Sequence, residues 1–474
     1  MAAAGAAAES TVMVARLSPR PQALRARVAA GTARVGPLEL AVALGAALAA
    51  VAGTIGADAR WLAALGRIIV DRGAIPDGIP YATAPSTGWH NVPVLAELVF
   101  RGVTSAAGDR GLLAAQVVGV AAALAIVAWD LRRWGADDLG GAVALLAVVV
   151  GSLPVLVIVR SQLFSVLLFP VLIALLRGEA RSPSLRIWLL VPLLALWSNL
   201  HGAVLVGLAV AATYLIFERG RQQPLLAGSV LVASALAICA TPALQHTPEY
   251  YASLARNEAA RRGEGLWAPI SFTSGFDLLL LAAAIALLVL AIRSRPPLWE
   301  AIALAGLAVL TVKTARSGVW LLFLAAGPAA RSIRFEPGQG RRLSAPTLAV
   351  ALALALFGVA RGPLLNGAGK PLLDDALHRA GRTAILAESI PAEQVALKGG
   401  HVWMSNPIDA FHRRDQRLYL DWLAGKPAGD AALRQARRVV LVIRGSPAAK
   451  RMARSRSFRP SGHDNNAILY VRRP

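Results

Sequence analysis

The residues best suited to chemistry in this sequence are a few polar side chains set within or beside long apolar runs. Asn199 and His201 stand in the middle of the apolar stretch Leu193–Ala209, and Asp58 follows directly on the apolar run that begins at Pro37. A carboxylate can act as a general base toward a hydroxyl group or can bind a divalent cation. Polar groups in hydrocarbon are costly unless they line a cavity, so the elements that carry them must enclose one.

The composition indicates a polytopic membrane protein. Of the 474 residues, 56% are hydrophobic and only 16% are charged, and apolar runs long enough to approach the hydrocarbon thickness recur along most of the chain. We predict about eleven transmembrane helices, over 37–57, 111–130, 139–159, 162–176, 186–199, 201–217, 224–244, 276–293, 298–312, 318–330 and 344–361.

The arginine distribution predicts the orientation of these spans. Lys and Arg in short loops mark the cytoplasmic side, and with the N-terminus inside, five arginine-bearing loops fall on that side. An odd number of spans then places the C-terminus outside. The abundance of Ala and Arg indicates a high-GC bacterial source, so we expect a bacterial plasma membrane. The net charge of +22 is explained by these loops, and basic stripes interleaved with aromatic residues are missing from the sequence, so we expect no nucleic-acid partner. The five loops lie at 132–133, 177–186, 219–221, 293–295 and 331–342.

The predicted fold is an all-α polytopic membrane bundle, N-in and C-out, with a small C-terminal α+β extracytoplasmic domain. Residues 1–36 form a basic cytoplasmic segment, and residues 37–361 form the membrane domain with outer loops 58–110 and 245–275. The tail at 362–474 changes to a mixed pattern, which predicts a separate unit on the outer face. Its predicted strands are 437–445 and 467–473, and its predicted helices are 371–381 and 415–425.

Two pairs of predicted spans turn too early to cross the membrane fully. The run 186–199 holds 14 residues, which reach about 21 Å against about 30 Å of hydrocarbon. The pair 139–159 and 162–176 has the same character, with its turn at Arg160-Ser161-Gln162. Helix pairs that turn early leave a crevice open to the outer side. We therefore expect Asn199 and His201 to line an outward-facing cavity.

Some predicted outer turns also carry basic residues, although Lys and Arg otherwise gather in the predicted cytoplasmic loops. Arg160 lies at one such turn, and Lys313 and Arg316 lie at another. Basic groups at an outer helix end suit a phosphate or diphosphate. The alternative is that each cation only reaches toward the interface for solubility, and that His201 only makes a packing hydrogen bond.

Acids in the first outer loop are the candidate bases. Asp58 ends the first span and Asp77 lies in a Pro-Asp-Gly sequence. Either carboxylate could accept a proton from a sugar hydroxyl or bind a divalent cation, although Pro-Asp-Gly also forms turns without any ligand. Cys239 is the only cysteine, so no cysteine-based metal site exists, and we assign no metal ligands. A polar loop in the tail, with Asn406, Asp409 and Asp415, either meets an acceptor or is a turn with a helix cap.

Four stretches resemble the bacterial GT-C-type membrane glycosyltransferases, whose donor is a polyprenyl-phosphate-linked sugar. They are Asp58-Ala-Arg-Trp with the following GAIP and YATAPSTGWHNVPVLAEL, then Arg160-Ser-Gln-Leu-Phe-Ser, Leu196-Trp-Ser-Asn-Leu-His-Gly, and Leu266-Trp-Ala-Pro. The tail stretch WMSNPIDAF with YLDWLAG resembles the outer domain of uncharacterised relatives. The resemblance implies a catalytic acid in the first outer loop, which Asp58 matches by position, and basic residues that hold the lipid phosphate, for which Arg160, His201 and Arg316 are the candidates. Asp77 is the second catalytic candidate, and the predicted substrate site also includes Gln162, Asn199, Trp267 and Lys313.

Three functions follow from these patterns. The first is transfer of a sugar from a polyprenyl-phosphate donor to an envelope glycan or lipid acceptor on the outer face, with membrane lipid as a further partner and a divalent cation left open. The second is a non-catalytic protein of the same fold that binds polyprenyl lipid or scaffolds envelope assembly, which the lack of an acidic pair in the first outer loop favours. The third is a transporter, which the lack of a repeat disfavours.

Overall fold

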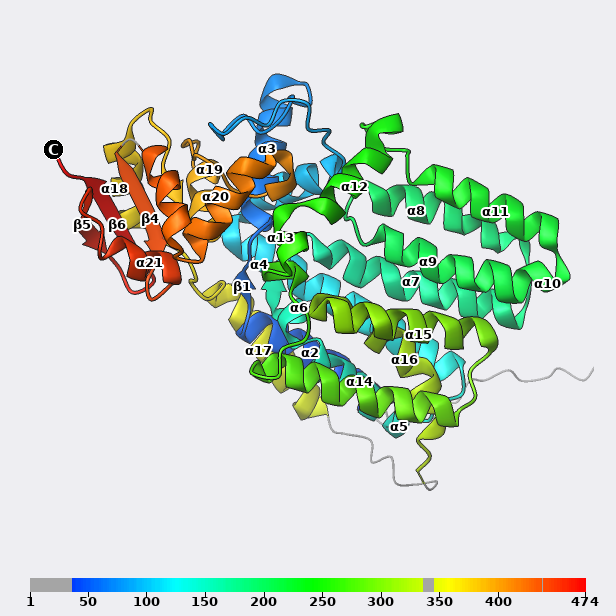
Figure 1. The fold of residues 1–474 in the computed structure, drawn as a ribbon. Coiled ribbons are helices and arrows are strands. Elements are labelled where there is room, and N and C mark those ends of the chain that lie inside the picture. Colours follow the sequence, from blue (N-terminus) through cyan, green and yellow to red (C-terminus); the bar gives the residue numbers. More distant parts are fainter. Residues whose placement is uncertain (1–35, 336–344, 437) are drawn as a thin grey trace, which may run out of the picture.

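A helical bundle carries a small α/β unit at one end in the computed structural model, which describes residues 36–335, 345–436 and 438–474 (Figure 1). Each of the eleven predicted spans overlaps one of its helices; the segment 1–35 lies outside the described residues. By length and composition, three helices in the described ranges, α4, α7 and α14, could cross a membrane. The bundle helices are α2 (Pro37–Val51), α4 (Val94–Arg133), α5 (Asp138–Gly151), α6 (Leu153–Val157), α7 (Gln162–Arg181), α8 (Leu190–Ser198), α9 (Val204–Tyr214), α11 (Pro224–Ala237), α14 (Gly275–Arg293), α15 (Leu298–Lys313), α16 (Gly318–Ser332) and α17 (Ala345–Arg361).

The first predicted outer loop is largely helical. Helix α3 (Ala59–Arg72) runs through this loop, and its buried face packs between α4 and α19 (Ser389–Leu397). Helix α4 begins at Val94 rather than near 111, because Gly108 takes a φ of 57° and joins two helical segments across a kink. Glycine adopts this backbone conformation without a steric penalty. The kink lets α4 start above the bundle, beside α3, and continue into it.

Two runs that the hydropathy pattern predicts as single spans end instead in short strands. Helix α2 stops at Val51 and is followed by β1 (Thr54–Ile55), while α6 is followed by β2 (Ile158–Val159). The two strands pair in parallel, with Thr54 opposite Ile158 and Ile55 opposite Val159. Parallel strands send their carboxyl ends to the same edge. The chain therefore leaves both strands side by side, toward Asp58 and toward Arg160.

The C-terminal unit is a four-stranded sheet with helices. The strand order is β3-β4-β6-β5, with β3 parallel to β4 and the other pairs antiparallel. Strands β4 (Val439–Ile443) and β6 (Ala467–Arg472) confirm the two predicted strands, and α18 (Lys370–Ala380) and α20 (Arg413–Leu423) confirm the two predicted helices. The remaining elements are β3 (Leu386–Ala387), β5 (Phe458–His463) and α21 (Pro447–Met452).

Backbone hydrogen bonds join the first outer loop to the C-terminal unit. The N–H of Val402 donates to the carbonyl of Tyr81 at 2.9 Å, and the N–H groups of Thr83 and Ala84 donate to the carbonyls of Val402 and Trp403, also at 2.9 Å. Val402 pairs with Ile385 as well, so the loop extends the edge of the C-terminal unit. The first outer loop and the C-terminal unit, more than 300 residues apart in sequence, are therefore joined by backbone pairing.

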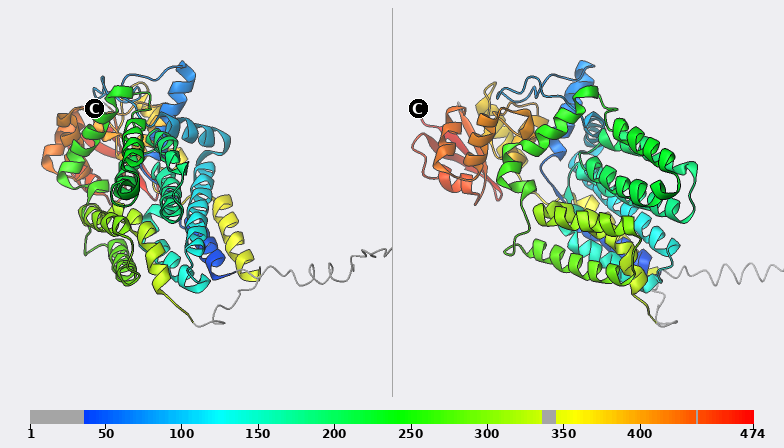
Figure 2. Two further views of the ribbon diagram at one scale, coloured as in Figure 1. Left: turned by 90° about the vertical axis from the view of Figure 1, so that its right-hand side faces the viewer. Right: turned by 45° about the vertical axis from the view of Figure 1, so that its right-hand side comes forward.

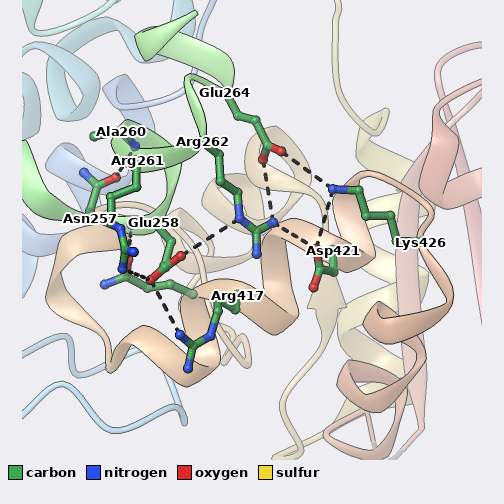
Figure 3. Close-up of polar contacts among 10 residues, drawn as sticks. Asn257, Glu258, Ala260, Arg261, Arg262, Glu264, Arg417, Asp421 and Lys426 are labelled. Atoms are coloured by element: carbon green, nitrogen blue, oxygen red, sulfur yellow. Dashed lines mark hydrogen bonds and ion pairs between the residues drawn. The ribbon is translucent and has the colours of Figure 1, made fainter.

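A second contact, made of ion pairs, joins the second outer loop to α20 (Figure 3). Helix α12 (Thr247–Arg256) leads into α13 (Glu258–Arg262), where Arg262 pairs with Asp421 at 2.8 Å. Lys426 lies 3.8 Å from Asp421 and from Glu264, and the N–H of Glu258 donates to Gln416 at 2.9 Å. Both outer loops thus hold the C-terminal unit at one end of the bundle.

Arginine-bearing turns lie at the opposite end of the bundle. The turn at α10 (Gly220–Gln222) and the turn between α14 and α15 both point away from the C-terminal unit (Figures 1 and 2). This separation agrees with the predicted charge bias, which assigns the loops at 219–221 and 293–295 to the side opposite the tail. The number of spans and their orientation in a membrane stay predictions.

A buried ion cluster ties four helices together near that far end. Arg177 in α7 pairs with Asp130 in α4 at 2.6 Å and with Glu300 in α15 at 2.5 Å, and it donates to the carbonyl of Leu324 in α16 at 2.8 Å. Gly327 makes room for this guanidinium, because a Cβ there would lie 2.4 Å from its atoms. The cluster fixes α4, α7, α15 and α16 relative to one another.

Removing the cation of this cluster should destabilise the bundle strongly. The change Arg177→Gln leaves Asp130 and Glu300 buried without their partner, which costs about 3–5 kcal/mol. The measurement is thermal unfolding of the detergent-solubilised protein. The matched control is Arg379→Gln, which breaks the exposed Arg379–Asp375 pair and should cost only about 0.3–0.5 kcal/mol. Equal melting temperatures for the two variants would contradict the assigned role.

Candidate active site

A cavity of about 380 Å³ lies where the outer ends of the bundle helices meet the C-terminal unit. Its walls come from the start of α3 and of α7, the α8–α9 turn, α12, the turn before α16, and the loop at 406–409. A smaller cavity of about 150 Å³ shares Gln162 and Arg316 with it. The predicted site residues that line one or both cavities are Asp58, Arg160, Gln162, His201, Trp267 and Arg316.

Asp58 is held in an unusual backbone conformation at the entrance to α3. Its φ is 97°, a conformation that costs a residue with a side chain about 1–3 kcal/mol. The Asp58 N–H donates to both carboxylate oxygens of Glu393 in α19, at 2.9 and 3.1 Å. Asn406 donates to the same carboxylate at 3.0 Å, and Trp61 donates its indole N–H to Asp58 Oδ1 at 3.4 Å. The C-terminal unit thus secures the candidate base.

Arg160 is brought to Asp58 by the β1–β2 pair. The N–H of Gly56 donates to the carbonyl of Val159 at 3.1 Å, which continues the ladder by one residue. A Cβ on Gly56 would lie 2.8 Å from Arg160 Nε and 2.4 Å from a methyl of Ile158. Only glycine therefore lets the chain leading to Asp58 pass directly over the Arg160 side chain. This close approach was not signalled by any sequence motif.

Arg316 approaches the cavity from the turn between α15 and α16, η5 (Ala315–Ser317). Its guanidinium stacks on the ring of Trp267, 4.4 Å from the ring centroid. The N–H of Ala315 donates to the carbonyl of Ala268 at 3.1 Å, which joins this turn to the second outer loop. Stacking orients the guanidinium plane without using its N–H groups, so these stay available to a ligand.

The two arginines at the site lack acidic partners. Over the described ranges, neither Arg160 nor Arg316 forms a side-chain hydrogen bond or an ion pair, and Arg160 Nε is buried. Burial lowers the pKa of Arg316, while the charge of Asp58 opposes this shift. Two unpaired cations facing an enclosed space favour an anionic ligand, because a buried charge is costly until it is paired.

His201 is fixed by a short chain of hydrogen bonds. The indole N–H of Trp197 donates to Ser165 Oγ at 2.6 Å, and Ser165 Oγ lies 2.7 Å from His201 Nδ1. The Ala203 N–H also donates to Nδ1, at 3.2 Å. An N–H can only donate, so Nδ1 acts as an acceptor and the neutral ring carries its hydrogen on Nε2. His201 therefore offers a hydrogen-bond donor, rather than a charge, at the cavity wall.

Two acids and one amide from the C-terminal tail bear on the site, and the sequence analysis named all of them except Glu393. Asn406 and Asp409 line the cavity, and Glu393 lies behind Asp58. Asp409 accepts from the indole N–H of Trp89 at 3.0 Å. Asp415 lies in the first turn of α20 and lines neither cavity. Nothing in the local sequence marked Glu393, since its partner lies 335 residues away.

Asp58 and Glu393 form a buried carboxyl pair, and their surroundings favour a state in which the pair holds a single proton. Burial raises the pKa of Glu393 to about 8, and the nearby charge of Asp58 adds to this shift. Burial also raises the pKa of Asp58, but the charges of Arg160 and Arg316 lower it again. Asp58 is therefore the carboxyl that ionises first and Glu393 the one that keeps the proton. A base with a pKa raised toward neutral pH suits proton abstraction.

Three predicted site residues lie outside the cavities. Asp77 is exposed and accepts from the N–H of Gly88 at 2.8 Å, as expected of a turn residue. Asn199 donates to the carbonyls of Ala195 and Ala240, at 2.8 and 2.7 Å, and so joins α8 to the segment after α11. Lys313 is exposed at the end of α15. Of the two polar residues predicted at the α8–α9 turn, the structure brings His201 to the cavity and not Asn199.

One group of side chains in the described part of the chain could hold a metal ion. His90, His246 and Glu249 place their ligand atoms within 4.8 Å of one another, and the two imidazole rings stack at 4.0 Å. Two imidazoles and a carboxylate suit a divalent cation such as zinc. The group lies on the outer loops beside the Asp58 cavity rather than in its wall, so it supplies no ligand at the candidate base.

The helical bundle, the outer loops and the small C-terminal sheet together have a GT-C-like fold. The solved structure of ArnT from Cupriavidus metallidurans bound to undecaprenyl phosphate is similar, with a TM-score of 0.50 at 13% identity, over 92% of this chain and 97% of that chain. The apo state of ArnT gives a TM-score of 0.41 at 14% identity, over 95% and 98%. The sequence matches no family model and no curated protein.

Proposed function

We propose that this protein transfers a sugar from a polyprenyl-phosphate donor to an envelope glycan or lipid acceptor on the outer face of a bacterial plasma membrane. The observation that carries the proposal is that the Asp58 carboxyl lies at two adjoining cavities with the guanidinium groups of Arg160 and Arg316, which form no ion pair in the described ranges. The likeness to ArnT, whose structure holds undecaprenyl phosphate, supports the same class of lipid ligand.

The proposed reaction is a single displacement at the anomeric carbon. The acceptor hydroxyl oxygen attacks that carbon, and its proton passes to the Asp58 carboxylate. The bond between the anomeric carbon and the phosphate oxygen breaks, and polyprenyl phosphate leaves with the bonding electron pair. Arg160 and Arg316 stabilise the negative charge that develops on the leaving phosphate, and the His201 Nε2–H is placed to donate to a donor or phosphate oxygen.

The lining of the cavity suits the two ends of such a donor. Charged and polar groups gather around Asp58 and Arg316, whereas Leu200, Leu254 and Leu310 supply apolar wall. An apolar wall next to a cationic end fits a lipid tail and its phosphate. The outer loops and the tail cover the polar end, which keeps water from competing with the acceptor hydroxyl.

Lipid-linked glycan analysis of a deletion strain tests the proposed function. We expect one polyprenyl-phosphate sugar to accumulate in the strain and one envelope glycan to lose the matching residue. The wild-type gene should restore both pools, and a gene carrying Asp58→Asn should restore neither. An unchanged lipid-linked pool, or full rescue by the Asn variant, would leave a binding or scaffolding protein as the better description.

The pH dependence of transfer should report the buried carboxyl pair. Activity needs ionised Asp58, so it should rise with pH along a limb above the ordinary range for an aspartate, because burial raises this pKa. The positive charge of Arg160 lowers the pKa of Asp58, so in Arg160→Gln ionisation of Asp58 becomes harder and the limb should move to higher pH. Glu393 keeps its proton while Asp58 ionises, so Glu393→Gln removes no charge and should leave the limb in place. The measurement is the transfer rate from about pH 4 to about pH 10. This interval runs from the ordinary pKa of an aspartate to above the pKa of Glu393.

The control for this experiment is Glu388→Gln, which changes another buried glutamate of the same unit. Glu388 accepts from Ser446 and from the N–H of Ile443 and makes no contact with Asp58 among the described residues. Its loss should leave the limb in place. A limb that stays in place in Arg160→Gln, or that moves in Glu393→Gln, would contradict the assigned order of ionisation.

A further inference from the structure

A second cavity lies away from Asp58, on the outer surface of the bundle. It measures about 830 Å³ and runs between α4 and α7, and its described lining residues are all different from those of the Asp58 cavity. Small residues make it deep: Ala125 in α4 faces Ala174 in α7, and a Cβ on Gly178 would meet no atom within 4 Å. Ile126 and Val171 add apolar wall. We call it the α4–α7 groove.

One end of the groove is polar and cationic. Arg133 closes α4 at this end, and Arg186 stands in the turn that follows α7. Neither guanidinium has an acidic partner in the ranges that the structure describes. The one carboxylate in the lining, Glu179, is satisfied by Ser184, whose N–H and hydroxyl donate to it at 2.8 and 2.5 Å. The free charge at this end of the groove is therefore positive.

The surface around the groove matches the boundary of a membrane. Trp129 is 51% exposed beside Arg133, and Leu185 and Trp188 are 73% and 40% exposed on the adjoining turn. Tryptophans at a lipid-facing surface gather at the level of the headgroups. The groove end is at the side of the bundle opposite the C-terminal unit, where the arginine bias predicts the cytoplasmic face. That face carries the anionic lipids that attract arginine.

We propose that the α4–α7 groove binds an anionic glycerophospholipid. An acyl chain would lie along the alanines and the glycine, and the headgroup phosphate would pair with Arg133 and Arg186. A zwitterionic lipid fits the apolar wall equally well but brings no net charge to the two arginines, so the groove discriminates by headgroup. The proposal is independent of any transfer reaction, because it uses no residue of the Asp58 site.

Native mass spectrometry of the full chain in detergent tests this site. The probes are phosphatidylglycerol, phosphatidylcholine with the same acyl chains, and undecaprenyl phosphate. We expect phosphatidylglycerol to bind more tightly than phosphatidylcholine, and the double variant Arg133→Gln, Arg186→Gln to bind it about 30-fold more weakly, from two arginines near the headgroup. Filling the groove with Ala174→Phe should weaken both glycerophospholipids.

The matched control is Arg293→Gln with Arg295→Gln, which removes two exposed arginines from another turn on the same side of the bundle. It should leave phosphatidylglycerol affinity unchanged within about threefold. Equal affinities for the two glycerophospholipids, or the same loss in the control, would overturn the proposal. Preferential binding of undecaprenyl phosphate that displaces phosphatidylglycerol would overturn it as well, since the groove would then belong to the donor lipid.

Discussion

Asp58→Asn should reduce the transfer rate by about 10²–10⁴-fold, the usual contribution of a general base. Asparagine matches aspartate in shape and tolerates positive φ better than most residues, so the backbone at φ 97° should survive the change. The amide cannot accept the acceptor proton. The measurement is the rate of sugar transfer by purified protein in lipid vesicles, together with the affinity for undecaprenyl phosphate, which should fall little.

Two acids of the same loop provide the controls for this experiment. Asp71 and Asp77 are exposed, and neither lines the cavity, so Asp71→Asn and Asp77→Asn should keep nearly full activity. A fully active Asp58→Asn variant would remove the proposed base. A loss of the same size in Asp77→Asn would move the reaction to the loop surface.

Replacing the two unpaired arginines should abolish tight binding of the lipid phosphate. Each charge-assisted contact contributes about 1.5–3 kcal/mol, so Arg160→Gln or Arg316→Gln alone should weaken binding of undecaprenyl phosphate by about 10–150-fold. The double variant should bind too weakly to measure. The measurement is the affinity for undecaprenyl phosphate by native mass spectrometry of the full chain in detergent, a readout that does not depend on the stacking of Trp267 on Arg316.

Lys313→Gln is the matched control, because it removes a cation from the same turn region, three residues before Arg316. Lys313 is exposed and outside the cavity, so the change should alter binding by less than about threefold, the size of a screened surface charge. A larger effect from Lys313 than from Arg316 would show that lipid phosphate is held by general surface charge and not by the enclosed site.

Most of the helical architecture could be predicted from hydropathy, and the exceptions have physical causes. Every predicted span overlaps a helix because apolar runs of this length must satisfy their own backbone hydrogen bonds. Hydropathy cannot separate a helix from a strand within one apolar run, so β1 and β2 were read as the ends of spans. The early start of α4 was missed because its first turns are amphipathic and lie outside the apolar run.

Part of the site could also be predicted from the sequence pattern. Asp58, Arg160, His201 and Arg316 stand out in sequence because each departs from an apolar or charge-bias pattern, and the structure places all four at the two adjoining cavities. Asn199 departs in the same way, yet it is used for helix packing, since an amide can satisfy backbone carbonyls. Pattern alone cannot separate these two uses.

Glu393 shows what sequence reasoning could not reach. It sits in an unremarkable helix of the tail, and its contact with Asp58 depends on how the C-terminal unit docks on the bundle. The unit docks through backbone pairing at Val402 and through the ion pair between Arg262 and Asp421. No local sequence motif predicts either contact. Gly56 is a similar case, because its role depends on a neighbour about one hundred positions away.

A structure of the purified protein with undecaprenyl phosphate, determined by cryo-electron microscopy, tests the central claim most directly. We predict the lipid phosphate within hydrogen-bond distance of both Arg160 and Arg316, with the Asp58 carboxyl facing the space next to it. A phosphate bound elsewhere on the bundle, or at this site with Asp58 turned away from it, would contradict the account.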